Sequence, residues 1–205
     1  EAVMEFNDRE IIPFRDRFEN KDYNFTEACM RKAGELGFLG VSVPEAYGGM
    51  GMGLVSTLLT CEYISSGTGS FSTAFGAHTG IGTLPITLYG TEDQKLKYIP
   101  KLASGEWFGA YCLTEPSAGS DANSGRTKAV LTEDGTHYKI TGQKMWISNA
   151  GFCKLFIVFA RIENDKNRKK NVSAAILNQE LNFPNTFLPN LKLAGSAARG
   201  AVLSH

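Results

Sequence analysis

The sequence predicts an α+β fold, with an all-helical N-terminal domain followed by an antiparallel β domain that forms a partial sandwich or barrel. Apolar residues recur at helical spacing over about the first hundred residues, whereas after Glu106 short apolar segments alternate with turn residues. The 205 residues, 42% of them hydrophobic, are enough to bury a core. We expect a helical domain at 1–107, an incomplete β domain at 108–167 and a divergent tail at 168–205 whose fold the pattern does not define.

The helical half is divided by proline, glycine and capping residues. Pro13 interrupts an amphipathic stripe at 1–19. Thr26 is expected to cap a second helix, which Gly37 ends. Thr91 and Gln94 have the spacing of a capping box, in which each side chain bonds the backbone N–H of the other. Further helices are expected at 54–65, at 72–89 with a break near Pro85, and from Thr91 to Gly105, with a glycine-rich loop at 43–53.

The second half is expected to contain short strands joined by tight turns. Asp134 and Gly135 form a strong hairpin signal between two of these strands. The expected strands are 107–113, 127–131, 138–141, 144–148 and 155–160, and a further strand-like group lies at 172–177. This succession favours an antiparallel arrangement.

The charge balance argues against a polyelectrolyte partner. The chain carries 21 basic and 21 acidic residues, so no global positive field is available for nucleic acid or anionic lipid. The tail at 168–205 differs from the rest, because it holds five basic residues and one acidic residue. No apolar run is long enough for a membrane-spanning helix, and we expect no membrane span.

The cysteines and histidines lack the spacing of a metal, redox or catalytic-triad site. We expect no metal ion. The isolated cysteines are interpreted as small packing residues, namely Cys29, Cys61, Cys112 and Cys153. The histidines are interpreted as surface or packed side chains, namely His78, His137 and His205.

The first candidate site is the segment 111–121, YCLTEPSAGSD. It leaves a predicted strand, turns at Pro116 and then offers small residues whose backbone N–H groups can approach an anionic ligand closely. The hydroxyls of Thr114, Ser117 and Ser120 lie in the same loop. A solvated turn rich in serine and glycine has the same composition, so the segment alone leaves both interpretations open.

The second candidate site follows about 25 residues later. Trp146 and Ser148 are two residues apart, and on a strand they share one face. A planar heteroaromatic ligand could stack on Trp146 while Ser148 bonds its edge. A core position is the alternative for a tryptophan considered by itself.

Together, the two segments closely resemble the characteristic motifs of the acyl-CoA dehydrogenase family, at 111–121 and at 142–149 (GQKMWISN). The similarity extends upstream through 36–49 (LGFLGVSVPEAYGG) and 89–106 (YGTEDQKLKYIPKLASGE). It covers about residues 1–166, an extent that chance does not explain.

The resemblance implies an enzyme that binds FAD, oxidises an acyl-CoA thioester to its trans-2-enoyl form and passes electrons to an electron-transferring flavoprotein. Trp146 is implied to cover the flavin face away from the substrate, and Ser148 to bond near N5, where many relatives have threonine. Ser120 is implied to lie near the phosphates, together with Gly119, and to reach the acyl-CoA substrate. The residues implied to bind the cofactor are Tyr111, Leu113, Thr114, Gly119, Ser120, Trp146, Ile147 and Ser148.

The resemblance implies no catalytic residue in this chain. The catalytic base of the family is a glutamate in a C-terminal helical bundle, and nothing in 1–205 matches that region. Glu115 and Asp121 are expected to shape the loop by bonding to backbone N–H groups. We therefore expect the chain to be an incomplete form with weak FAD affinity and little dehydrogenase activity, and without the homotetramer of full-length relatives.

Two alternatives stay open at this point. One is a flavin oxidase relative, such as an acyl-CoA oxidase, and the other is a non-catalytic remnant that acts as an interaction module. The expected compartment is the bacterial cytoplasm, or the mitochondrial matrix if the source is eukaryotic.

Overall fold

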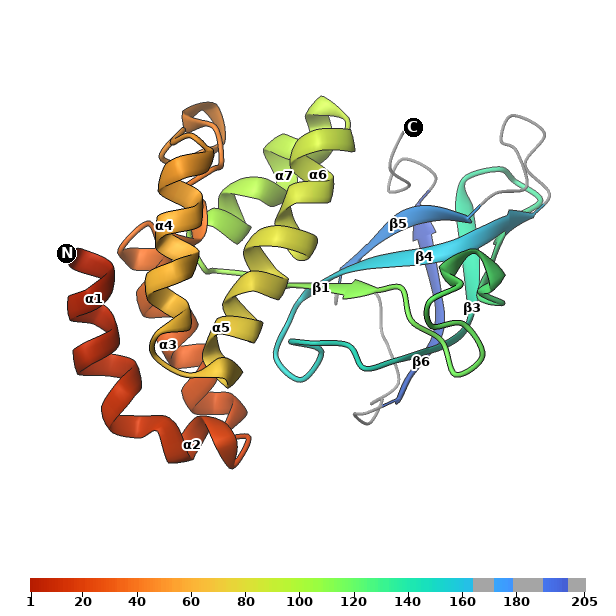
Figure 1. Cartoon of the computed structure of the whole chain (residues 1–205). Helices are drawn as coiled ribbons and strands as arrows, with labels where there is room; N and C mark the ends of the chain where they lie inside the picture. The colour runs from red at the N-terminus through yellow and green to blue at the C-terminus, as the bar shows by residue number, and fades with distance from the viewer. Residues whose placement is uncertain (164–171, 179–189, 199–205) are drawn as a thin grey trace. The chain divides into compact units, whose positions relative to one another are not determined.

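A computed structural model describes residues 1–163 and the backbone of two later strands, 172–178 and 190–198 (Figure 1). The chain divides into two compact units, Glu1–Gly109 and Ala110–His205. The described elements of the first unit are helices up to the start of the first strand, and those of the second are strands with one short helical turn. The predicted order of helices before strands is therefore confirmed.

The helical unit begins with short helices and continues with longer ones (Figure 1). The α-helices are α1 (Ala2–Phe6), α2 (Arg15–Glu19), α3 (Tyr23–Glu35), α4 (Leu54–Ser65), α5 (Gly69–Gly76), α6 (Leu84–Tyr89) and α7 (Glu92–Ala103). Wider π-helical turns lie at Asn7–Ile11 and Ala77–Thr83, and tighter 3₁₀ turns at Ile12–Phe14, Phe38–Gly40 and Glu45–Tyr47. The 3₁₀ turn that contains Pro13 is the predicted interruption of the first stripe.

The ends of two helices follow the capping chemistry of the sequence. At α7 the Gln94 N–H donates to Thr91 Oγ1 at 3.3 Å and the Thr91 N–H donates to Gln94 Oε1 at 2.9 Å, which confirms the capping box. Gly37 follows the last turn of α3 with φ of 81°, a left-handed conformation that suits glycine. These positions were predicted from local spacing alone.

The predicted start of α3 was wrong. Asp22 caps this helix, because its Oδ1 accepts a hydrogen bond of 3.0 Å from the Phe25 N–H. Thr26 lies inside the first turn, where its hydroxyl donates back to the Asp22 carbonyl at 3.0 Å. A threonine and an aspartate four residues apart both carry capping oxygens, and here the aspartate holds the cap.

The core of the helical unit is a cluster of phenylalanines. Phe71 on α5 is fully buried, with ring centroids 5.9 Å from Phe6 on α1 and 5.5 Å from Phe18 on α2. Phe75 lies one turn further along α5, 6.5 Å from Phe71. The first residues of the chain are therefore packed onto α5 by aromatic contacts.

His78 is a buried histidine that joins the π-helical turn to the end of this unit. Its Nδ1 accepts from the Gly109 N–H at 3.1 Å, and its Nε2 lies 3.0 Å from the Leu102 carbonyl. The ring is therefore neutral, with the proton on Nε2. Burial lowers the pKa of His78 to about 4, against the opposing effect of the bond to Leu102. His78 is thus a packed histidine, one of the two interpretations given for it.

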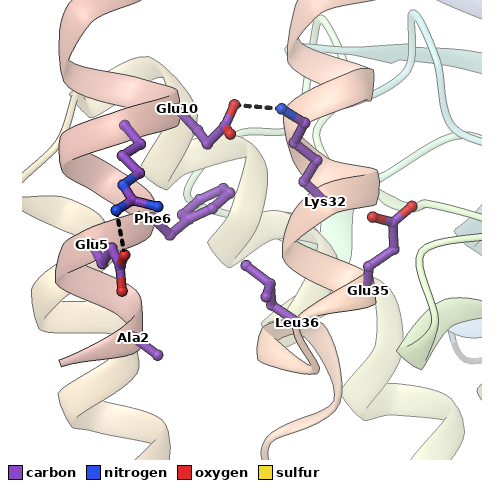
Figure 2. A pocket seen from close by; sticks show the side chains of 8 residues that line it. Ala2, Glu5, Phe6, Glu10, Lys32, Glu35 and Leu36 are labelled. Carbon is purple, nitrogen blue, oxygen red and sulfur yellow. Dashed lines mark hydrogen bonds and ion pairs between the residues drawn. The ribbon is translucent and has the colours of Figure 1, made fainter.

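A shallow pocket of about 410 Å³ lies between the first helical turns and α3 (Figure 2). Four of its charged lining residues are paired, because Glu5 bonds Arg9 at 2.8 Å and Glu10 bonds Lys32 at 2.5 Å. Its lining residues come from the first ten residues and from α3, and none belongs to either motif. The pocket therefore shares no residue with the predicted site.

The β unit is one sheet (Figure 1). The strands are β1 (Gly109–Cys112), β2 (Lys128–Leu131), β3 (His137–Met145), β4 (Leu155–Glu163), β5 (Val172–Asn178) and β6 (Asn190–Ala198), with a 3₁₀ turn at Ala122–Ser124. The strand order is β1-β4-β2-β3-β6, and β5 pairs with β4. The strand-like group at 172–177 is confirmed as β5.

The pairings of β2 with β3, of β3 with β6 and of β4 with β5 are antiparallel, as predicted. The hairpin of β2 and β3 turns at Asp134–Gly135, where Gly135 has φ of 68°, and it pairs Lys128 with Thr141. β2 also pairs with β4, in parallel, between Lys128 and Arg161. The sheet is therefore mixed. The two strands expected at 138–141 and 144–148 form one strand that ends at Met145.

Candidate functional site

The structure brings the two motifs together through hydrogen bonds to the backbone carbonyls of the loop. The Met145 N–H donates to the Thr114 carbonyl at 3.0 Å. The preceding residue, Lys144, donates from Nζ to the Leu113 carbonyl at 3.0 Å. The loop that leaves β1 is therefore attached to the last two residues of β3, although 29 or more residues separate them in the sequence.

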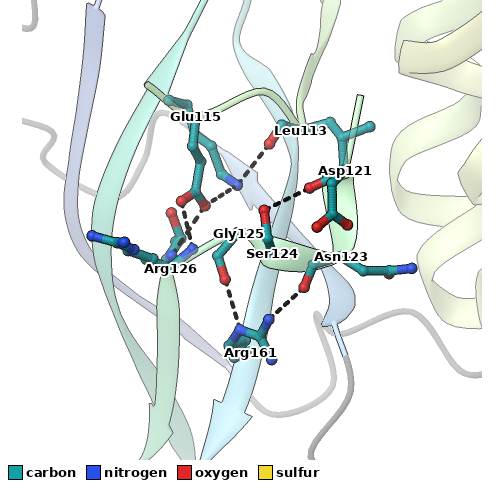
Figure 3. Close-up of polar contacts among 10 residues, drawn as sticks. Leu113, Glu115, Asp121, Asn123, Ser124, Gly125, Arg126 and Arg161 are labelled. Carbon is teal, nitrogen blue, oxygen red and sulfur yellow. Dashed lines mark hydrogen bonds and ion pairs between the residues drawn. The ribbon is translucent and has the colours of Figure 1, made fainter. Parts of the chain in front are cut away.

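Glu115 organises the first motif (Figure 3). Its Oε1 accepts from Lys144 Nζ at 2.7 Å and from the Thr127 N–H at 3.0 Å, and its Oε2 accepts from the Arg126 N–H at 2.5 Å. The loop itself is closed by two hydrogen bonds of 3.1 Å between the backbones of Glu115 and Ala118. The prediction that Glu115 shapes the loop through backbone N–H groups is confirmed.

Asp121 shapes the next turn in a different way from the one predicted. Its backbone carbonyl accepts from the Ser124 N–H at 3.1 Å and from the Ser124 hydroxyl at 2.8 Å. Within the described part of the chain, its carboxylate bonds no backbone N–H. The same turn is attached to β4, because Arg161 Nε donates to the Gly125 carbonyl at 2.6 Å and Arg161 Nη2 donates to the Asn123 carbonyl (Figure 3).

The charges of the site are buried and mutually stabilised. The side chains of Lys144 and Glu115 are only 2% and 4% exposed. Burial by itself would raise the pKa of Glu115, but the hydrogen bonds from Lys144, Arg126 and Thr127 outweigh it and lower the pKa to about 2. Burial also lowers the pKa of Lys144, and Glu115 opposes this effect. The Glu115 carboxylate is therefore ionised at neutral pH, and it forms a buried ion pair with Lys144 Nζ at 2.7 Å.

The cysteines near the site are packing residues. Cys112 on β1 and Cys153 before β4 are buried and free. Burial raises the pKa of the Cys112 thiol to about 12, against the opposing charge of Lys144. Among the described residues, no group of three or more metal-ligating side chains is found, and no helix is long and apolar enough to cross a membrane.

The predicted cofactor residues of the first motif lie on β1 and on the loop after it. Tyr111, Leu113 and Thr114 are half-buried, and the Tyr111 ring lies 4.8 Å from that of Phe159 on β4. Gly119 and Ser120 are exposed, and no atom lies within 4 Å of a Cβ added to Gly119.

The second motif is exposed at Trp146, as a stacking residue requires. Its side chain is 69% exposed, an unusual value for a tryptophan, and its φ of 60° turns the chain immediately after β3. Ile147 is buried and Ser148 is exposed. The expectation that Trp146 and Ser148 share a strand face was wrong, because the strand ends at Met145 and Ser148 lies in the following turn.

The chemistry of these residues fits a flavin dinucleotide. Trp146 offers an exposed aromatic face, and the exposed hydroxyls of Ser120 and Ser148 are available as donors. Within the described residues, the backbone N–H groups of Ser117 and Gly119 have no protein partner. Free N–H groups on a turn bind phosphate oxygens, and an exposed indole stacks on a planar ring.

Sequence reasoning missed the residues that hold this site in shape. Lys144 stood inside the second motif without a role, and Arg161 and Thr127 were not singled out. A signal existed for Lys144, because the even-numbered residues of β3 face inward at Tyr138 and Ile140. Lys144 is a later even-numbered residue of the same strand, and a lysine that faces inward implies a buried counter-charge.

Comparison with known proteins agrees with the helical unit, the sheet and the paired motifs. The model of the acyl-CoA dehydrogenase N-terminal domain matches residues 1–106, and the model of the acyl-CoA dehydrogenase middle domain matches residues 110–191. The chain therefore belongs to the acyl-CoA dehydrogenase family. The middle-domain match continues past residue 167 into the region expected to diverge, and β5 and β6 extend the same sheet.

Individual relatives agree with this assignment. A probable acyl-CoA dehydrogenase of Bacillus subtilis (strain 168) is 44% identical over 204 residues, which cover 98% of this chain and 33% of that protein. An acyl-CoA dehydrogenase from Bacillus anthracis, solved in complex with FAD, has a TM-score of 0.90 and 36% identity, covering 100% of this chain and 36% of that one. The chain spans about a third of the length of these two relatives.

A solved structure described as the electron-transferring flavoprotein of Acidaminococcus fermentans has a TM-score of 0.84 and 29% identity. The match covers 99% of this chain and 56% of the chain in that structure. Similarity over the whole chain thus extends to a structure studied for flavin-based electron bifurcation.

Proposed function

We propose that this chain forms the helical and flavin-contacting parts of an FAD-dependent acyl-CoA dehydrogenase. The enzyme would oxidise an acyl-CoA thioester to trans-2-enoyl-CoA and pass the electrons to an electron-transferring flavoprotein. The observation that carries the proposal is the attachment of the loop at 113–118 to the end of β3, which joins the two family motifs into one site.

The residues of this site have distinct proposed roles toward the cofactor. Trp146 covers one face of the flavin ring, and Ser148 donates a hydrogen bond to its edge. The N–H groups of the loop, with Gly119 and Ser120, bind the pyrophosphate, and Ser120 also contacts the acyl-CoA. Tyr111, Leu113, Thr114 and Ile147 complete the set of cofactor residues. When bound, FAD supplies the hydride acceptor of the oxidation.

The proposal assigns no catalytic base to these residues. Glu115 is unsuited to that role, because its carboxylate already accepts three hydrogen bonds and its pKa is lowered to about 2. A base that removes an α-proton needs a pKa nearer the working pH. Glu115 instead keeps the loop in the conformation that binds the cofactor.

The compartment and assembly belong to the same proposal. We place the enzyme in the bacterial cytoplasm, in accordance with the bacterial source of the first relative described above. The homotetramer of full-length relatives is not expected from this chain by itself.

Titration of the chain with FAD, followed by flavin emission, tests the proposal. We expect weak but saturable quenching, which Trp146→Ala abolishes and Trp146→Phe largely keeps, because phenylalanine retains an aromatic face. Absence of saturable FAD binding by the unmodified chain would refute the proposed function. If the chain alone bound one FAD per molecule and also turned over an acyl-CoA, the proposal that it is an incomplete form would be refuted.

A further inference from the structure

We propose that Lys144 is a positioning residue for the flavin-binding loop, with Glu115 as its buried counter-charge. This inference rests on the proposed function. The Lys144 ammonium group donates to the Leu113 carbonyl at 3.0 Å and to Glu115 Oε1 at 2.7 Å. One side chain of β3 therefore holds both the backbone and a side chain of the loop.

Burial makes these contacts difficult to replace. An ion pair on the surface adds little to stability, because water solvates either charge when the other is removed. The side chains of Lys144 and Glu115 are 2% and 4% exposed, so neither charge has water as a substitute partner. Lys139 lies on the same strand with an exposed side chain and serves as the matched comparison.

The effect of Lys144 reaches a third segment through Glu115. The same carboxylate accepts the N–H groups of Arg126 and Thr127, which lead into β2. Lys144 thereby connects β3, the loop and the start of β2 around one buried charge pair.

This arrangement positions the loop without using the donors assigned to the pyrophosphate. The loop is held by the Leu113 and Thr114 carbonyls and the Glu115 carboxylate. The N–H groups of Ser117 and Gly119 and the hydroxyl of Ser120 have no protein partner among the described residues. The loop is thus set in shape before the ligand arrives, which lowers the entropic cost of binding.

The test compares Lys144→Met with Lys139→Met in the full chain. Amide hydrogen exchange without FAD reports the loop, through the N–H groups of Arg126, Thr127 and Met145, and the sheet, through that of Ile140. In Lys144→Met we expect faster exchange at these three amides, which donate to the loop, and unchanged exchange at Ile140. We expect the FAD dissociation constant to rise about 10- to 100-fold, the loss typical of a hydrogen bond from a charged group. Lys139→Met should leave both measurements unchanged.

Each result decides the proposal. Unchanged FAD affinity in Lys144→Met, or faster exchange spread evenly over β3, would overturn it, because Lys144 would then be only a structural residue. If the unmodified chain binds no FAD, the proposed function fails and the flavin role of Lys144 fails with it, whereas the exchange data still report whether Lys144 holds the loop. If Lys144→Met does not fold, the uncharged pair Lys144→Met with Glu115→Gln takes its place, and the same two measurements decide.

Discussion

We expect the helical unit to lose stability as the pH falls from about 6.5 to about 4, and we expect His78→Gln to remove most of that loss. His78 is fully buried and neutral, and its Nδ1 accepts the Gly109 N–H. In the unfolded chain the ring takes up a proton near pH 6.5, whereas in the folded unit it does so only near pH 4. The contribution of the neutral His78 ring to the free energy of unfolding is therefore complete above pH 6.5. It falls by about 3 kcal/mol on acidification to pH 4.

The assay is urea unfolding over this pH range in a Trp146→Phe background, where Trp107 is the remaining tryptophan and lies in the helical unit. Glutamine can replace only part of the bonding of the ring, so His78→Gln should cost about 1–3 kcal/mol at neutral pH. Its unfolding free energy should then vary little between pH 6.5 and pH 4. His137 is exposed, and His137→Gln should keep the dependence of the parent. A parent chain with a flat profile, or a His78→Gln profile as steep as that of the parent, would refute the reasoning.

Three further predictions concern the β unit and α7. Gly142→Ala should destabilise the β unit by about 1–3 kcal/mol in thermal unfolding, because the added Cβ would lie 2.2 Å from Thr127 Oγ1. Gly119→Ala is the control, because no atom lies within 4 Å of a Cβ added at that position. Equal losses of stability in the two variants would contradict the packing argument. Thr91→Ala should cost about 1 kcal/mol through loss of the capping box, whereas Thr91→Ser, which keeps a hydroxyl, should cost less. The lowered pKa of Glu115 stabilises the β unit above about pH 4.5, and this contribution is lost as the pH falls to about 2. In an acid titration followed by circular dichroism, the loss of folded structure should be shallower in Glu115→Gln than in the parent. Identical titration curves of the two proteins would count against the charge pair.

Features that depend on neighbouring residues could be predicted from the sequence. The capping box at Thr91 and Gln94 and the hairpin at Asp134–Gly135 are fixed by side chains and turns within a few residues. The cap of α3 was mistaken for a local reason as well, because Asp22 and Thr26 are both good capping residues and sequence spacing does not rank them.

Features that depend on distant residues could not be predicted in this way. Lys144 and Glu115 are 29 residues apart, and Arg161 meets the Gly125 carbonyl across 36 residues. Their pairing follows from the strand order, including the parallel contact of β2 with β4, which no local pattern contains. The family motifs identified the segments of the site, but only the fold identified what holds them.

The pairing of β3 with β6 has a consequence for synthesis of the chain. β6 pairs with β3 over its full length, from His137 with Ala198 to Met145 with Asn190, whereas β2 reaches only to Thr141. The end of β3 that carries Lys144 therefore gains its strand neighbour only after residue 190 has left the ribosome. Until then, or in a chain cut at residue 167, β3 presents an open edge on which another strand can add, a recognised route to aggregation. Residues 190–198 would in this sense protect an edge of the site that is synthesised well before them.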